Sequence, residues 1–365
     1  MKSAYLLLLI GTTLELIGGL VIGVYLCIAL GSLLILYFNR KDGIRVPKLV
    51  LYLLLGFQVV VLLRFLAYHI TEDAVYFMLL NLMVGLVLAS ALIGKKLLVL
   101  LPFIVITLSV AAIVGWISDR GRVFALDLNP NVVASFLCVA IFLLTDKWKL
   151  LIPVAVVAIL FTGSYWGALG LLAGLAYLIA TGQFSKQLAY LLLISIAVAI
   201  LGFTFFDLGS TWNTADVRTV VSDGSVTSVG ELDTRLNQYE GAVENISVLG
   251  NGIILKYINE DGTKLSVRYD DPVHNIFLKT LDDYGPAALA ILVTLLGYLF
   301  YKAKTYRVVL VALVFSSLGD YCWIWYTSLM VWFFVIVGLA SREAYELVTI
   351  SIPGLQLCKK ESAND

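Results

Sequence analysis

The chain has 365 residues, of which 61% are hydrophobic and 14% are charged, and its mean hydropathy is +0.96. This composition excludes an ordinary soluble domain, in which about 25% of the residues are charged. The 25 basic and 25 acidic residues balance, so no net field attracts nucleic acid and no nucleic-acid partner is predicted.

Long apolar runs follow one another along the chain and are typical of membrane-spanning helices. We predict about twelve spans, at residues 4–18, 20–38, 49–69, 75–94, 97–117, 130–145, 150–163, 166–182, 188–206, 286–301, 308–319 and 323–340. A single long helix over residues 4–38 is the alternative to the first two. Two spans that form a tight hairpin are preferred, because basic residues flank residues 4–38 at both ends.

Lysine and arginine residues gather on one face of the predicted spans. Sixteen of the 25 lie at the N-terminus, on every second link or on the tail, namely Lys2, Arg40, Lys41, Arg45, Lys48, Lys95, Lys96, Lys147, Lys149, Lys186, Lys302, Lys304, Arg307, Arg342, Lys359 and Lys360. The positive-inside rule makes this face cytoplasmic. We therefore expect a multi-pass protein of the cytoplasmic (inner) membrane with both termini in the cytoplasm.

One link is much longer than the others. Between spans nine and ten, residues 207–273 carry eleven acidic and five basic residues and face outward. The predicted organisation is nine spans in 1–206, an outer segment in 207–285, three spans in 286–341 and a cytoplasmic tail in 342–365. Within the outer segment, apolar residues spaced by four and three predict a helix over 232–246.

The end of the outer segment predicts a helix that lies in the membrane interface. Phe277, Leu281 and Tyr284 fall on one side, whereas Asn275, Lys279, Asp282 and Asp283 fall on the other, which is expected to face water. Asp271 is the predicted N-cap. Gly285 and Pro286 predict a break before the next span.

Two further residues are interpreted from their places in the chain. His274 falls near the start of the interfacial helix, where the helix dipole favours a neutral imidazole that accepts a proton. Arg64 falls inside span three and is expected to extend toward Tyr68 and the outer face.

The stretch that begins at His274 resembles the O-antigen ligase and polymerase superfamily, membrane glycosyltransferases that use polyprenyl-diphosphate-linked glycans. The family pattern of His-Asn, nine residues, Gly, two residues and then Gly, Thr or Tyr is met by His274-Asn275 and Gly285, but Ala288 departs from it. Three further stretches are similar to the family: "TRLNQYEG" with Arg235, which is followed by "GNG" at 250–252, then "LDLNPNVVASFL", and "SLGDYCWIW" with Asp320. The resemblance covers most of the chain and implies an all-α polytopic, GT-C-like fold.

The resemblance also implies the roles of particular residues. His274 would be the base and Arg235 a cation for the leaving diphosphate. A second family arginine is replaced by Tyr165 in "TGSYW". The remaining substrate-binding candidates are Arg122, the first candidate replacement for that arginine, Arg268, the second, together with Asn275, Tyr165 itself and Asp320.

The implied reaction moves a glycan from a polyprenyl diphosphate to a hydroxyl of a glycan or glycolipid acceptor, with inversion, at the outer face. Neither a cofactor nor a metal is predicted, since Asp270/Asp271 and Asp282/Asp283 are interpreted as solvated surface pairs. Two alternatives stay open: a transporter for a polar solute or lipid-linked glycan, and a catalytically inactive relative that acts in assembly.

Overall fold

The computed structural model describes most of the helical residues and parts of the links. The described residues are 6–8, 10, 21–38, 44–68, 97–119, 130–206, 217–222, 225–230, 239, 243, 246–250, 256–257, 266–267, 275–319, 327–341 and 347–350. Within them the protein is mostly helical, as predicted. The helices are α2 (Val21–Phe38), α3 (Lys48–Tyr68), α6 (Leu101–Asp119), α7 (Pro130–Leu143), the 3-10 helix η2 (Asp146–Leu151), α8 (Ile152–Phe161), α9 (Tyr165–Ala180), α10 (Lys186–Phe206), α13 (Ile276–Lys302), α14 (Arg307–Ser316) and α16 (Thr327–Ala340).

The helices coincide with the apolar runs of the sequence. Ten of the twelve predicted segments contain a helix. The helix ends lie within about four residues of the predicted ends, except that α13 begins ten residues before the predicted span. The segment at 75–94 lies outside the described residues, and of the segment at 4–18 residues 6–8 and 10 are described. Among the described helices, α13 is the one whose length and composition suffice to cross a membrane.

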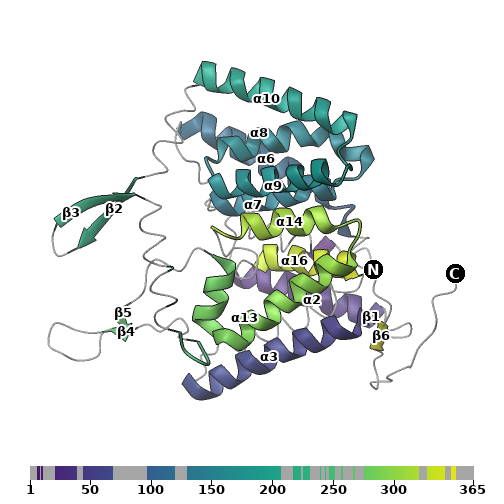
Figure 1. Ribbon diagram of the computed structural model, residues 1–365, viewed down its shortest axis with the longest axis vertical. Coiled ribbons are helices and arrows are strands. Elements are labelled where there is room, and N and C mark those ends of the chain that lie inside the picture. Colours follow the sequence, from purple (N-terminus) through teal and green to yellow (C-terminus); the bar gives the residue numbers. More distant parts are fainter. Residues whose placement is uncertain are drawn as a thin grey trace.

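Helix α7 lies at the centre of the bundle. Thirteen of its fourteen residues are buried, because its sequence is apolar on every side. It contacts α6, α8, α9 and α14, and Figure 1 shows these helices stacked with their axes roughly aligned.

Helix α9 approaches its neighbours through glycines. Gly167, Gly170 and Gly174 are spaced by three and four residues and so lie on one face. A Cβ on Gly170 would lie 2.8 Å from the carbonyl oxygen of Ala312 in α14 and 3.0 Å from Sγ of Cys138 in α7. Small residues on one helix face permit this close backbone approach, as in many membrane bundles.

Helix α13 consists of two parts joined at a sharp break, which Figure 1 shows as a bend. Gly285 has φ 82° and ψ 178°, a conformation that favours glycine, and Pro286 begins the second part. The predicted break is confirmed. We call Ile276–Tyr284 the first half of α13 and Pro286–Lys302 the second half. Helix α3 packs along α13.

Short antiparallel strand pairs lie outside the bundle. β2 (Val217–Ser222) pairs with β3 (Ser225–Gly230), and β4 (Lys256–Tyr257) pairs with β5 (Ser266–Val267). Both pairs project from the same end of the bundle (Figure 1), which we call the hairpin end. β1 (Ile44–Pro47) pairs with β6 (Leu347–Ile350) toward the opposite end.

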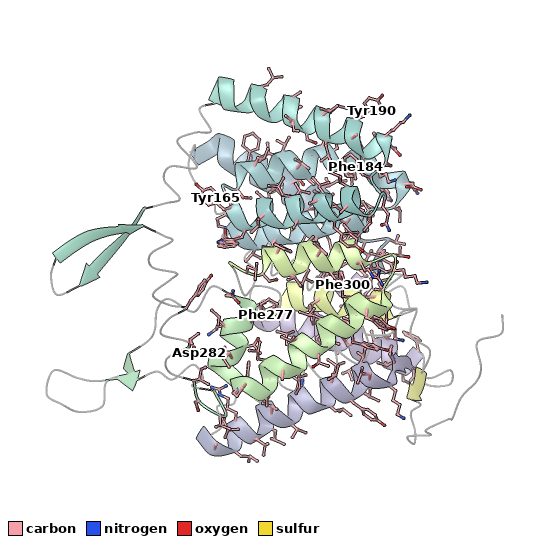
Figure 2. The ribbon with its side chains drawn as sticks, viewed as in Figure 1. Tyr165, Phe184, Tyr190, Phe277, Asp282 and Phe300 are labelled. Atoms are coloured by element: carbon pink, nitrogen blue, oxygen red, sulfur yellow. The ribbon has the colours of Figure 1, made fainter. Side chains whose placement is uncertain are left out.

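The side chains labelled in Figure 2 separate between the two ends of the bundle. Tyr165, Phe277 and Asp282 lie at the hairpin end, whereas Phe184 and Phe300 lie toward the other end. The predicted alternation of links places the first three residues outside and the last two in the cytoplasm. These residues do separate between the two ends of the bundle, and which end faces outward stays a prediction.

Candidate functional site

Asn275 connects the start of α13 to the end of α14. Its backbone is extended (φ −157°, ψ 125°), and its Oδ1 accepts hydrogen bonds from the amides of Phe277 at 2.9 Å and Leu278 at 3.1 Å. These amides would otherwise lack partners in the first helical turn. Its Nδ2 donates to the carbonyl oxygen of Leu318 at 3.0 Å. The prediction of Asp271 as the N-cap is therefore wrong, because Asn275 fills that position.

A second side chain bonds to the same carbonyl oxygen. The hydroxyl of Tyr239, 79 residues away in the sequence, donates to the Leu318 oxygen at 3.0 Å. The amide of Ile276 donates to the neighbouring carbonyl of Ser317 at 3.0 Å. Residues 317–319, which we call the Leu318 junction, therefore hold both Tyr239 and the start of α13.

The start of α9 reaches the same junction. Tyr165 is the first residue of α9 and is 44% exposed at the hairpin end (Figure 2). The ring of Trp166 lies so close to Gly319 that a Cβ there would overlap the indole. The hydroxyl of Ser164 caps this helix by accepting from the amide of Gly167 at 3.3 Å. Three segments far apart in the sequence thus meet at the Leu318 junction.

The first half of α13 contains a buried ion pair. Nζ of Lys279 lies 2.9 Å from Oδ1 of Asp283, and the two side chains are 9% and 1% exposed. Oδ2 of Asp283 is also buried and has no hydrogen-bond partner among the described residues. The prediction that Lys279 and Asp283 face water is wrong, whereas Asp282 is half-buried. The helical pattern identifies a polar face but not the neighbours that cover it.

Arg64 approaches this ion pair from α3. Its Cζ lies 5.3 Å from the centroid of the Tyr284 ring, within the range of a cation–π contact. Phe57 packs edge-on against the same ring with a centroid distance of 5.6 Å. Arg64 therefore lies against α13, whereas the side chain of Tyr68 lies outside the described residues and the predicted approach to it stays a prediction.

Burial raises the pKa of the Asp283 carboxyl from 3.8 to about 6. The charge and hydrogen bond of Lys279 oppose this rise, Asp282 adds to it, and the charge of Arg64 opposes it. Burial also raises the pKa of the Tyr284 hydroxyl, and the charge of Asp283 adds to that rise. Both residues belong to the first half of α13, before the stretch predicted to cross the membrane.

A turn of the long outer segment covers the break in α13. Gly250 lies so close to the backbone of Asp283 and Tyr284 that a Cβ would overlap it, and a Cβ on Gly285 would overlap the carbonyl of Val248. Both glycines have positive φ, 75° and 82°, which other residues rarely adopt. The outer segment is therefore fixed to α13 at this break as well as at the Leu318 junction.

The structure describes two of the seven predicted site residues. Asn275 and Tyr165 lie at the same end of the bundle, and both adjoin segments that meet at the Leu318 junction. The other five, which include both proposed catalytic residues, lie outside the described residues: His274, Arg235, Arg122, Arg268 and Asp320.

Several described residues of the site were not assigned to it from the sequence. The Leu318 contact is made by a main-chain carbonyl, which no residue type reveals. Tyr239 falls within the helix predicted over 232–246, where it counts as one of the regularly spaced apolar residues. Arg64 and Lys279 gave a usable signal, because a charged residue in or beside an apolar run is costly without a partner.

Among the described residues, no three His, Cys, Asp or Glu side chains are grouped so as to hold a metal ion.

No family of known proteins matches the chain, and no curated protein matches it.

Proposed function

We propose that the protein is an inverting, metal-independent glycosyltransferase of the cytoplasmic membrane that moves a glycan from a polyprenyl diphosphate to a sugar hydroxyl. The observation that carries this proposal is the pair of hydrogen bonds on the Leu318 carbonyl. One comes from Asn275, which follows His274 directly, and the other comes from Tyr239, four residues after Arg235. The two segments that hold the proposed catalytic residues are thus anchored at one point.

Covalent geometry limits how far His274 and Arg235 can lie from these two anchored residues. Neighbouring Cα atoms are about 3.8 Å apart, and four residues of fully extended chain span at most about 14 Å. His274 and Arg235 are therefore each joined by only a short stretch of chain to a residue that donates to the Leu318 carbonyl oxygen, namely Asn275 and Tyr239. This supports a single site for proton removal and for diphosphate binding.

The proposed reaction requires one base and one cation. His274 takes the proton of the acceptor hydroxyl as its oxygen attacks the anomeric carbon. The bond between that carbon and the phosphate oxygen breaks, and the diphosphate leaves with the electron pair. Arg235 stabilises the charge that develops on the leaving diphosphate. The products are a glycoside of inverted configuration, the polyprenyl diphosphate and the proton held by the imidazole.

Two observations support the proposed membrane location. The second half of α13 is apolar and is part of the described helix whose length and composition suffice to cross a bilayer. Large apolar side chains on several helices also point away from the core, among them Leu66, Phe103, Leu172, Ile179, Tyr190 and Leu193. A lipid environment accommodates an apolar exterior of this extent, which water disfavours.

The test is glycan transfer by the purified protein in lipid nanodiscs. The donor is a polyprenyl-diphosphate-linked oligosaccharide, the acceptor is an oligosaccharide or glycolipid, and a chelator is present throughout. We expect turnover in the wild type and a loss of about 10²-fold or more in His274→Ala, because a positioned base contributes about 10²–10⁴ in rate. Arg235→Ala is expected to lose activity as well.

Matched variants separate these effects from general damage. His69→Ala removes the other histidine, and Arg218→Ala removes an arginine of strand β2. Both are expected to retain wild-type turnover. Transfer that is indifferent to His274, or that stops in the chelator, contradicts the proposal. No transfer with any donor favours the inactive relative.

A transporter is the second candidate, and the break in α13 favours it. Transporters often place ionisable residues at discontinuous helices, and here Lys279 and Asp283 lie directly before Gly285. Reconstituted vesicles distinguish the two functions. Movement of an intact lipid-linked glycan across the bilayer, without a new glycosidic bond, supports transport.

A further inference from the structure

The first half of α13 follows the cap residue Asn275 and ends at Tyr284, and its two ends are held differently. At its start, hydrogen bonds join it to the Leu318 junction. At its end, Tyr284 is buried in an apolar cluster with Val61 and Ala288. The same ring lies under the guanidinium of Arg64. Arg64 is thus the charged group that α3 contributes at the end remote from the proposed base.

The charges around Asp283 divide into those on its own helix and those on another. Lys279, Asp282 and Tyr284 belong to the first half of α13, whereas Arg64 belongs to α3. The Lys279–Asp283 pair joins residues four apart on one helix. That pair stiffens the helix from within. Arg64 is the charged member of this set that comes from another helix, and it contacts Tyr284 beside Phe57 and Val61 of the same helix α3.

We propose that Arg64 is a positioning residue for the transfer reaction and holds the first half of α13 against α3. The inference rests on the proposed function. Nine residues of helix separate Tyr284 from Asn275, about 13 Å along the axis, so Arg64 acts on the chemistry through the helix. A tilt of about 5° at the Tyr284 end moves the Asn275 end by about 1 Å. A misplacement of that size costs about 10²-fold in rate.

Two variants test this role. Arg64→Gln removes the charge and the cation–π contact, and Arg64→Lys keeps the charge but loses the planar group. We expect kcat to fall about 10- to 100-fold in Arg64→Gln and less in Arg64→Lys. The KM for the donor is expected to stay within twofold, because donor binding does not involve Arg64.

A second measurement does not depend on activity. Hydrogen–deuterium exchange of the amides at 279–284 is expected to be at least fivefold faster in Arg64→Gln than in the wild type. Lys48→Gln is the matched control, since Lys48 lies 5.8 Å from the Tyr52 ring at the other end of α3. This control is expected to leave both exchange at 279–284 and kcat unchanged.

The two measurements separate failure of this role from failure of the proposed function. If exchange is faster in Arg64→Gln than in the wild type but the wild type transfers no glycan, the attachment to α3 is supported and the proposed reaction is removed. Unchanged exchange in both Arg64 variants overturns the positioning role whatever the activity. A raised KM with unchanged exchange also overturns it, because Arg64 then contacts substrate. If Arg64→Gln does not purify as a folded protein, Arg64→Lys decides by the same criteria.

Discussion

Asn275 uses one side chain for two separable tasks. Its Oδ1 caps α13 through two backbone amides, and its Nδ2 reaches across to the Leu318 carbonyl. Substitutions that retain one task and remove the other therefore distinguish helix capping from attachment to the junction.

The first prediction compares Asn275→Ser with Asn275→Ala. Serine keeps an oxygen that can cap the helix, whereas alanine keeps neither function. We expect Asn275→Ala to lose about 0.5–2 kcal/mol of stability and Asn275→Ser to lose less. Turnover is expected to fall in both, because both lose the bond to Leu318. Thermal unfolding in detergent and the transfer assay measure the two effects. Equal stability of the two variants contradicts the capping role.

The second prediction concerns pH and Asp283. Its folded-state pKa of about 6 lies above the ordinary value of 3.8, so the folded protein binds this proton more tightly than the unfolded chain. Ionisation therefore opposes folding. This destabilising contribution is small below about pH 4, grows as the pH rises and is complete above about pH 6. An asparagine at this position cannot ionise.

We therefore expect the stability of the wild type to fall relative to Asp283→Asn between pH 4 and pH 7. Thermal unfolding midpoints at a series of pH values provide the comparison, and the trend matters rather than the absolute difference. Asp146→Asn, at an exposed position, is the control and should track the wild type. A constant difference between wild type and Asp283→Asn contradicts the raised pKa.

At the scale of elements, the glycine face of α9 determines how closely the bundle packs. The third prediction is that Gly170→Ala destabilises the protein by about 1–3 kcal/mol, because the added Cβ meets a backbone oxygen that cannot move independently. Gly297→Ala is the matched control. Apart from the adjoining backbone of its own helix, no described heavy atom lies within 4 Å of a Cβ there, so helix propensity should stabilise it by about 0.5–1 kcal/mol. Thermal unfolding of both variants gives the comparison.

The contrast between helix positions and helix surroundings shows what the sequence can predict. Apolar runs located ten helices, and Gly285 with Pro286 located the break in α13, because each signal is local. The burial of Lys279 and Asp283 was missed, since it depends on α3 and on the turn at 247–250. Those neighbours are distant in the sequence, and the helical pattern carries no information about them.

At the scale of the whole molecule, the two ends of the bundle differ in what they carry. The strand pairs β2–β3 and β4–β5 lie at the hairpin end, as does the Leu318 junction. The other end has the link from α13 to α14, where Lys302 ends α13, Lys304 follows and Arg307 begins α14. The junction itself was not predictable. It joins Tyr239, Asn275 and Trp166 at main-chain atoms, whereas the sequence supplied only the residues that adjoin it.

The fourth prediction tests this orientation by thiol labelling. Ser228→Cys in β3 and Lys304→Cys are introduced separately after Cys27, Cys138, Cys322 and Cys358 are replaced by serine. We expect a membrane-impermeant maleimide to label Ser228→Cys in intact cells at least tenfold faster than Lys304→Cys. After permeabilisation both should react. Faster labelling of Lys304→Cys in intact cells contradicts the proposed orientation.

The pairing of β1 with β6 has a consequence for biosynthesis. Ile44 pairs with Ile350, so the ribosome has to translate nearly the whole chain before this ladder begins to form. Closing so long a loop is slow relative to forming local contacts. The first link is therefore expected to await its partner strand while later helices insert, and trypsin cleavage at Arg45 in stalled nascent chains should decline only once residue 350 has emerged. The pairing of β1 with β6 is thus expected to be among the last steps in the assembly of this protein.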